Sequence, residues 1–300
     1  TGVQTCALPI SDQYMITEQL TLKNGIRLVH QFADSPVAHL GVFIPTGSRD
    51  ESAEEHGLAH FIEHTIFKGT EKRSVLQVLN RLENVGADLD AFTTKEETCI
   101  NATFLHGYYG RTLELFSDIL LHSTFPEKEI DKEKRVVADE IKSYLDNPAE
   151  QIFDDFEEQV FKGHPLGRNI LGTPRSLKKF NGEMIRSFIR RHYDPARIII
   201  ASVGNIEFKR LSRMVARYFE EADRPEDSCA RLPFVEYQIT KQFRRKKVYQ
   251  VHCITGGTAY PGNHPRRLAM AVLNNLLGGP VMNSRLSLAL RERSGLTYHN

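Results

Sequence analysis

The hydrophobic and polar positions of the chain follow two periods, and the shorter period marks the expected strands. Apolar and polar residues alternate on both sides of Asn24-Gly25, a pair typical of a tight hairpin turn. A nearly continuous apolar run, VAHLGVFIP at residues 37–45, predicts a buried strand. The expected strands lie at residues 20–31 (two strands joined by the hairpin), 37–45, 89–104 (two strands) and 198–203.

Elsewhere apolar residues recur every three or four positions, which is the period of an amphipathic helix. Residues that start or stop helices bound several of these segments, with Ser74 as an N-cap, Pro126 in a first turn and Asn147-Pro148 as a stop. The expected helices lie at residues 54–67, 74–84, 108–121, 126–145, 149–161, 182–192 and 208–219.

An acidic, proline-containing stretch, EEADRPEDSCARLP at residues 220–233, predicts a linker between two domains. The chain after it repeats the opening order of elements, with an expected strand at 247–255 and expected helices at 265–277 and 285–293. A gene duplication with one metal-binding copy explains this repeat, and a chance recurrence of the same order is the alternative. The expected domains are 15–221, a first domain; 222–240, a linker; and 241–300, the start of a second, incomplete homologous domain.

Composition narrows the class of protein. A chain of 300 residues is too long for one small core, and 40% hydrophobic with 26% charged residues is ordinary for a soluble globular protein. The formal net charge of +1 gives no bulk electrostatic attraction to nucleic acid or to an anionic membrane. No apolar run approaches the roughly 18 residues of a membrane span. We therefore expect neither nucleic acid nor a membrane as a partner.

The cysteines and residues 1–11 indicate the cellular compartment, and the two chain ends indicate how much of the sequence is native. Four cysteines lie far apart without a CxxC pair, which indicates reduced thiols in a cytoplasmic setting. Residues 1–11 (TGVQTCALPIS) lack the basic start and the hydrophobic length of a signal peptide. We interpret residues 1–14 as a non-native segment and expect native sequence to begin near Met15. Because Asn300 interrupts an expected strand, we also expect a truncated chain.

The candidate chemistry begins at the segment His60-Phe61-Ile62-Glu63-His64. In a helix, residues four apart lie one above the other, with about 5–6 Å between their Cβ atoms. Both imidazoles can therefore reach one zinc ion at roughly 2.0–2.1 Å. Glu63 borders the same face and is the candidate general base. For this segment alone, an ordinary polar helix face is the alternative.

A catalytic zinc needs a third protein ligand and one open position. The expected helix at 126–145 carries Glu133 and Glu140, two turns apart on one stripe beside apolar residues, where carboxylates are costly to bury unless paired or metal-bound. We predict Glu140 as the third ligand, and Glu133 as a residue that orients a ligand histidine or the water. A solvated charge is the alternative for Glu140. His56, four residues before His60, is the alternative ligand to test.

These segments together resemble a known family. The sequence HGLAHFIEHTIFKGT, with Glu140 seventy-six positions after His64, is similar to the pitrilysin or insulinase-like zinc metallopeptidases, the inverted HxxEH type also called inverzincins. Within them it resembles bacterial relatives of mitochondrial processing peptidase. The resemblance covers nearly the whole chain from Asn24 onward and includes further segments: NGIRLVHQ, GSRDE, GHPLGRNILGT and LGGPVMNSRLSLALRERSGLTY.

The resemblance implies an α+β fold of two homologous domains, each a mixed, mostly antiparallel sheet with helices packed against it, which together form half of a clamshell. It implies a bacterial zinc endopeptidase that hydrolyses extended peptides or unfolded segments; the cytoplasmic setting is the expectation from the cysteines and residues 1–11. Family members need two halves, so we expect a homodimer or a pairing with a homologous subunit. The alternatives are a non-catalytic, peptidase-like subunit for assembly or peptide binding, and a fragment that binds zinc without turnover.

The resemblance also implies roles by position. His60, His64 and Glu140 match the zinc ligands, Glu63 the catalytic base and Glu133 an auxiliary glutamate. In the implied mechanism, zinc lowers the pKa of a water molecule. Glu63 removes the proton of this water as it attacks the peptide carbonyl, and then returns the proton to the leaving amine.

Substrate contacts are implied in both halves of the chain. Arg291 and Tyr298 match an arginine and a tyrosine that contact bound substrate and help to stabilise the developing oxyanion. An edge strand that receives substrate as an added strand matches the segment that contains Asp90, Ala91, Phe92 and Thr93. Two positions depart from the family pattern, since Asp90 stands where asparagine is usual and Ala87 where a second glycine is usual. An ionised Asp90 cannot donate a hydrogen bond, which puts substrate positioning there in doubt.

Overall fold

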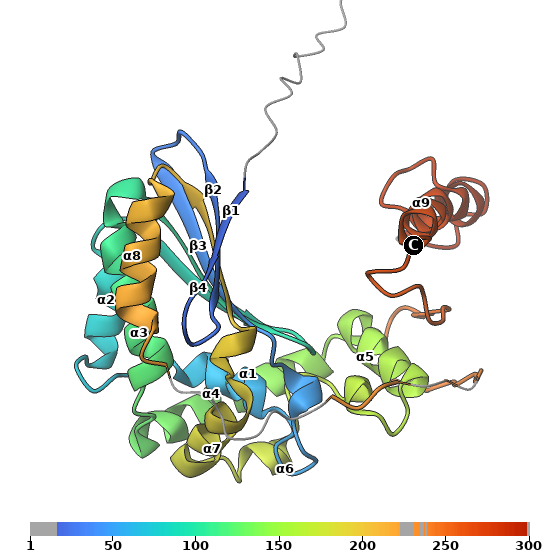
Figure 1. Cartoon of the computed structure of the whole chain (residues 1–300). Helices are drawn as coiled ribbons and strands as arrows, with labels where there is room; N and C mark the ends of the chain where they lie inside the picture. Colours follow the sequence, from blue (N-terminus) through green and yellow to red (C-terminus); the bar gives the residue numbers. More distant parts are fainter. Residues whose placement is uncertain (1–16, 223–230, 235–236, 238, 299–300) are drawn as a thin grey trace, which may run out of the picture. The chain divides into compact units, whose positions relative to one another are not determined.

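The computed structural model describes residues 17–222, 231–234, 237 and 239–298 (Figure 1). They fall into two compact units, one that ends at His252 and one that begins at Cys253. The first unit holds the sheet and the three predicted metal ligands. In the described part of the chain, no helix combines the length and the apolar composition needed to cross a membrane.

Among the described residues, six strands form one mixed sheet in the order β1-β2-β6-β3-β5-β4 (Figure 1). β2 and β6 are parallel, whereas all other neighbours are antiparallel. The strands are β1 (Thr17–Thr21), β2 (Arg27–Phe32), β3 (Val37–Ile44), β4 (Asp88–Thr93), β5 (Thr98–Leu105) and β6 (Ile199–Gly204). β2 to β6 lie where the sequence predicts strands, whereas β1 begins three residues before the expected hairpin, at Thr17. The α+β class is confirmed.

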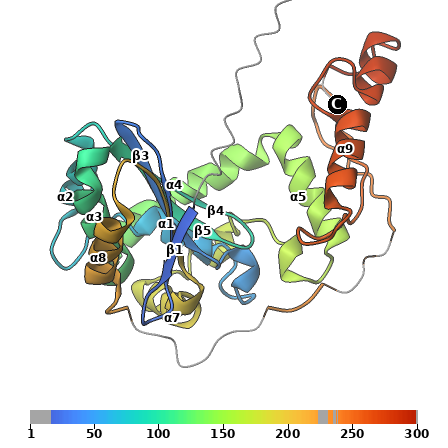
Figure 2. The ribbon, with the colours of Figure 1, turned by 45° about the horizontal axis from the view of Figure 1, so that its top comes forward.

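Alternation along the strands gives the sheet one buried face. On β3, Leu40 and Val42 are buried, whereas Val37 and His39 are exposed on the other face. Three helices cover the buried face side by side, as Figures 1 and 2 show: α2 (Val75–Glu83), α3 (Tyr109–His122) and α8 (Phe208–Phe219). The core of the unit therefore lies between this helical layer and the sheet.

The remaining helices of the first unit are α1 (Leu58–Thr65), α4 (Glu127–Leu145), α5 (Pro148–Val160), α6 (Pro174–Leu177) and α7 (Gly182–His192). Short 3₁₀ turns lie at η1 (Ser48–Asp50), η2 (His106–Tyr108), η3 (Pro165–Gly167) and η4 (Pro195–Arg197). Capping side chains explain several starts, because Asn147 accepts from the N–H of Ala149 and Asn181 from that of Met184. α7 and α8 span the same residues as the helices expected from the sequence.

The helix expected at residues 54–67 is shorter in the structure. α1 begins only at Leu58, because Gly57 before it has φ of 92°, a left-handed conformation that cannot continue a right-handed helix. Residues 54–57 form turns instead. Gly57 also packs backbone to backbone, since a Cβ atom built on it would lie 2.7 Å from both Cα of Gly172 and the carbonyl oxygen of Leu171. Both the left-handed backbone and the close contact with Gly172 therefore require glycine at this position.

The second unit contains α9 (Arg267–Gly278) and a π-helical segment, η5 (Ser287–Glu292), close to the two helices expected there. The strand expected at 247–255 is wrong, because these residues have no regular secondary structure. A strand needs a neighbour for its backbone hydrogen bonds, and the described residues from 239 to 298 include no other strand to pair with it. The predicted linker at 222–240 stays a prediction, and residues 223–230, 235–236 and 238 lie outside the described residues.

The contact at Gly57 can be tested against a second left-handed glycine. Gly86, just after α2, has φ of 71°, and a Cβ atom there would meet nothing within 4 Å. Gly86→Ala should lower the free energy of unfolding by about 1 kcal/mol through backbone strain alone. Gly57→Ala adds a backbone clash, so we expect a loss of about 3 kcal/mol. Urea denaturation measures both, and equal losses would show that the contact with Gly172 carries no weight.

Candidate metal centre

A buried carboxylate fixes the first turn of the helix that carries both histidines. Glu51 is 3% exposed and accepts hydrogen bonds from the backbone N–H groups of Gly57 at 2.9 Å and Ala59 at 2.8 Å. N–H groups at a helix start lack partners within the helix, and Glu51 supplies partners for two of them. Burial raises the pKa of the Glu51 carboxyl well above its usual value, and these two hydrogen bonds act against that rise. Arg168 donates to the backbone carbonyl of Glu51 at 2.9 Å, so the loop before α6 holds this cap in place.

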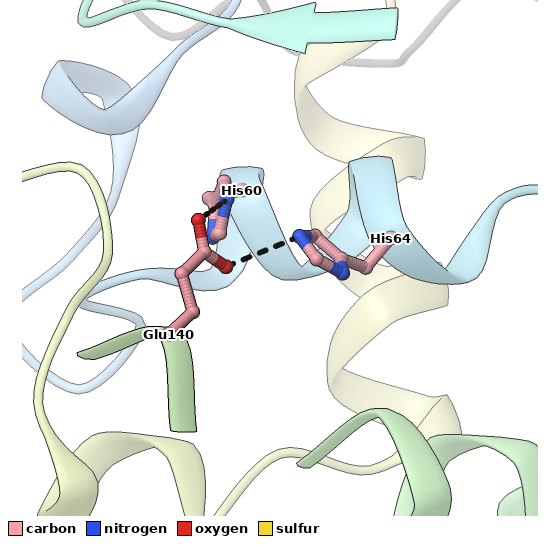
Figure 3. Close-up of side chains that lie close together, drawn as sticks. All are labelled: His60, His64 and Glu140. Carbon is pink, nitrogen blue, oxygen red and sulfur yellow. Dashed lines mark ion pairs between the residues drawn. The ribbon is translucent and has the colours of Figure 1, made fainter. Parts of the chain in front are cut away.

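The three predicted ligands lie close together (Figure 3). His60 and His64 come from successive turns of α1, and Glu140 comes from α4. Nε2 of His60 lies 3.7 Å from Oε1 of Glu140, and Nε2 of His64 lies 3.5 Å from Oε2 of the same carboxylate. The two imidazole centroids are 4.7 Å apart, and one donor atom from each residue lies within 4.8 Å of the other two.

This donor set fits a zinc ion. Two imidazole nitrogens and one carboxylate oxygen form a common ligand set of catalytic zinc. A tetrahedral ion with ligands at roughly 2.0–2.1 Å separates neighbouring donors by about 3.4 Å, close to the distances from Glu140 to the two rings. Oε2 of Glu140 is buried and has no hydrogen-bond partner among the described residues. A cation within the cluster would supply that partner.

The protonation of His60 also suits a metal. Burial lowers the pKa of His60 to about 4, and the neighbouring His64 acts in the same direction. The ring is therefore neutral at pH 7, with a lone pair that a metal can use.

Glu63 lies on α1 between the two histidines and lines the same cleft as His60 and Glu140. Burial raises the pKa of its carboxyl, and the carboxylates of Glu140 and Asp90 act in the same direction. A raised pKa makes a carboxylate a stronger proton acceptor. The position and the electrostatics of Glu63 both suit a general base.

Glu133 lies behind the cluster, as the sequence predicts for an orienting residue. Its Oε2 is 3.4 Å from Nδ1 of His64, and its Oε1 is 2.8 Å from Nζ of Lys68. With Nδ1 turned to Glu133, His64 presents Nε2 to Glu140. In metal sites, a second carboxylate at this place fixes the tautomer and the orientation of a ligand histidine.

The cluster opens into a cleft of about 580 Å³. Besides His60, Glu63 and Glu140, the cleft is lined from β4, α4, α5 and the loop before α6 by Ala91, Phe92, Thr93, Ser143, Tyr144, Asn147, Glu150, Asp154, Ile170 and Leu171. The volume is within the usual range of ligand-binding clefts, roughly 300–1,000 Å³. β4, which forms one wall of the cleft, is an edge strand of the sheet.

Comparison with known proteins identifies the family. Residues 28–174 match the model of the insulinase family, peptidase family M16, and residues 179–299 match the model of the M16 inactive domain. The uncharacterized zinc protease YmxG of Bacillus subtilis is 36% identical over 284 residues, which cover 94% of this chain and 68% of that protein. The chain belongs to peptidase family M16. The resemblance inferred from the sequence is therefore confirmed.

Other M16 relatives match the chain over similar lengths. The mitochondrial-processing peptidase subunit beta of Caenorhabditis elegans is 32% identical, over 86% of this chain and 56% of that protein. The chain spans about two thirds of the length of the bacterial zinc proteases that it matches. The crystal structure of a protease from Helicobacter pylori shares the fold, with a TM-score of 0.81 and 23% identity over 95% of this chain and 70% of that chain.

The predicted substrate residues of this M16 chain lie in two places. Ala91, Phe92 and Thr93 of β4 line the cleft, whereas the side chain of Asp90 is exposed. Arg291 and Tyr298 belong to the second unit, where the guanidinium carbon of Arg291 lies 5.3 Å from the ring centroid of Tyr298. Their contact with substrate stays a prediction.

His56, the alternative ligand, is not part of the metal cluster. Its Nε2 lies 2.9 Å from the carbonyl oxygen of Asn169. The left-handed Gly57 separates His56 from α1, so the spacing of four residues to His60 does not place the two rings on one helical face.

Sequence reasoning missed most of the cleft wall. Ser143, Tyr144 and Asn147 follow Glu140 by three, four and seven positions and all line the cleft. The helical period that places Glu140 would also have found them, once Glu140 was chosen as a ligand. Asp154 lies on the next helix, and its place in the cleft depends on the turn between α4 and α5, which periodicity does not describe.

Removal of single donors tests the ligand set. The purified chain should bind one zinc ion, and both His60→Ala and Glu140→Gln should weaken zinc affinity by about a hundredfold or more, because each removes one of three protein donors. His56→Ala is the matched control, and its zinc affinity should stay close to that of the unmodified chain. Competition with a chromophoric chelator measures the zinc affinity of the unmodified chain and of the three variants. Loss of zinc in the His56 variant alone would overturn the assignment.

Proposed function

We propose that the chain carries the catalytic centre of a zinc-dependent endopeptidase that hydrolyses extended peptides or unfolded protein segments. The observation behind this proposal is the convergence of His60, His64 and Glu140 beside a cleft that Glu63 also lines. Catalytic zinc sites have three protein donors and an open position, whereas structural zinc sites use four protein donors. Membership of family M16 and the zinc-protease names of several relatives support the same activity.

The residues of the centre divide the work. A zinc ion held by this set would polarise the peptide carbonyl and lower the pKa of the attacking water. Glu63 accepts the proton from the water and returns it to the leaving amine. The same carboxylate therefore acts first as general base and then as general acid. Neutral His60 offers a lone pair, and Glu133 keeps His64 in the orientation that faces Glu140. Side chains of β4 and α4 form the walls that position the peptide.

We further propose that substrate binds to β4 as an added strand. β4 pairs with β5 along one side and is the last strand of the sheet on the other. Such an edge offers alternate backbone N–H and C=O groups to an extended peptide, with little demand on its sequence. A peptide bound there would run along Ala91, Phe92 and Thr93, which line the cleft beside His60 and Glu63.

The proposal includes a second half-molecule, from a homodimer or from a homologous subunit. One relative is named as the beta subunit of mitochondrial-processing peptidase, which supports pairing. A non-catalytic, peptidase-like subunit is the alternative function. The complete set of His60, His64, Glu140 and Glu63 favours catalysis, because a protein that only binds peptide has no use for a base beside a metal site.

Glu63→Gln separates metal binding from catalysis. The amide is similar in size but cannot accept the proton, so kcat/KM should fall about a thousandfold while zinc affinity is unchanged. A quenched fluorescent peptide measures hydrolysis, with and without chelator. Glu83→Gln on the exposed part of α2 is the matched control and should keep full activity. Full activity of the Glu63 variant would remove this residue from its role, and chelator-resistant hydrolysis would contradict the metal mechanism.

Strand addition predicts a period of two in the substrate. N-methylation of every second backbone amide should lower kcat/KM about tenfold per site, the effect of losing one hydrogen bond of roughly 1–1.5 kcal/mol. Methylation of the intervening amides, which point away from β4, should change it less than about twofold. A methyl scan of one cleaved peptide gives both series. A scan without alternation would mean that substrate does not bind as a strand.

A further inference from the structure

The segment at residues 67–70, which follows α1, carries a lysine, Lys68, that the proposed reaction does not use. Nζ of Lys68 lies 2.8 Å from Oε1 of Glu133. The side chain of Glu133 is only 10% exposed, whereas that of Lys68 is 26% exposed and reaches solvent. The pair therefore connects the surface with a carboxylate beside the metal cluster.

The two oxygens of Glu133 have different partners. Oε1 meets Lys68, and Oε2 lies 3.4 Å from Nδ1 of His64. On its other side, His64 presents Nε2 to Oε2 of Glu140 at 3.5 Å. An ammonium group, a carboxylate and an imidazole thus form a line that ends at the metal cluster. A buried carboxylate without a cation is costly, and its position would then depend on His64 alone.

The backbone around Lys68 is held firmly to α3. Gly69, between Lys68 and Thr70, takes a left-handed conformation with φ of 114°. The Thr70 hydroxyl donates to Oδ2 of Asp118 at 2.8 Å and accepts from the backbone N–H of Arg73 at 3.0 Å. Arg73 itself pairs with Asp118. Lys68 therefore extends toward Glu133 from a fixed point.

We propose that Lys68 is a positioning residue of the metal centre: its ammonium balances and fixes the Glu133 carboxylate, which in turn holds the His64 ring in its metal-binding orientation. The proposal rests on the proposed metal centre but not on peptide hydrolysis. An ordinary surface ion pair, worth about 0–1 kcal/mol, is the competing explanation. The burial of Glu133 and its contact with a ligand histidine argue against it.

Zinc affinity of the full chain gives the test. Lys68→Met should weaken zinc binding about tenfold, the lower end of the effect of losing a group that supports a ligand. Lys68→Arg keeps the charge and should lose less than about threefold. Lys132→Met is the matched control, because Lys132 neighbours Glu133 in sequence but is exposed and pairs with Glu129. It should bind zinc like the unmodified chain. Circular dichroism of the zinc-free proteins checks folding, and Lys68→Gln replaces Lys68→Met if the latter does not fold.

A double-mutant cycle shows whether Lys68 acts through Glu133. In a Glu133→Gln background, Lys68→Met should add less than about twofold to the loss of zinc affinity, because the carboxylate that it supports is gone. The visible absorption bands of the cobalt-substituted chain should shift in Lys68→Met and return in Lys68→Arg. An unchanged zinc affinity in Lys68→Met, or an equal loss in both backgrounds, would overturn the proposal. Absence of peptidase activity in the unmodified chain would contradict the proposed function and leave these binding measurements valid.

Discussion

The centre depends on the packing of α4 against α1, because this contact brings a carboxylate to the two imidazoles. Helix geometry alone sets the spacing of His60 and His64, but Glu140 is far away in the sequence and arrives only through the tertiary fold. The two helices are in contact, and buried residues of both, such as Ile62 and Val137, belong to the same hydrophobic core. Metal sites tolerate errors of about 0.2 Å in ligand distance, so small shifts between the helices would matter. The hydrogen bonds from the start of α1 to Glu51 and the backbone contact of Gly57 with Gly172 also fix the position of α1.

The second constraint is the concentration of negative charge. Glu63 and Glu140 line the cleft, and Glu133 lies behind it, so three carboxylates lie near two imidazoles. In partly desolvated surroundings this arrangement is unfavourable without compensation. The three carboxylates differ in their surroundings. Glu133 pairs with Lys68, the side chain of Glu140 remains 42% exposed, and burial raises the pKa of Glu63. A divalent cation at the cluster would offset part of this negative charge, so metal binding and the stability of this region should be coupled.

Sequence reasoning succeeded where structure follows from local spacing. The motif that includes His60 and His64, and helices with clear caps such as α7, depend on contacts within a few residues. It failed where partners are distant. For the strand expected at 247–255, the described residues from 239 to 298 contain no second strand to pair with. The early start expected for α1 overlooked the left-handed Gly57. Lys68 could not be identified from the sequence either, because its role appears only when α4 lies beside the end of α1.

The boundary between the two M16 sequence models is not a boundary between folded units. Residues 179–299 match the inactive-domain model, yet β6 and α8 within them belong to the unit that holds the metal centre. β6 pairs with both β2 and β3, and the side chain of Asn24 donates to the carbonyl of Phe219 in α8 at 2.7 Å. Without β6, β2 and β3 would each lose one of their two neighbouring strands. The unit that holds the metal cluster therefore includes residues well beyond His60 and His64, at least to the end of α8.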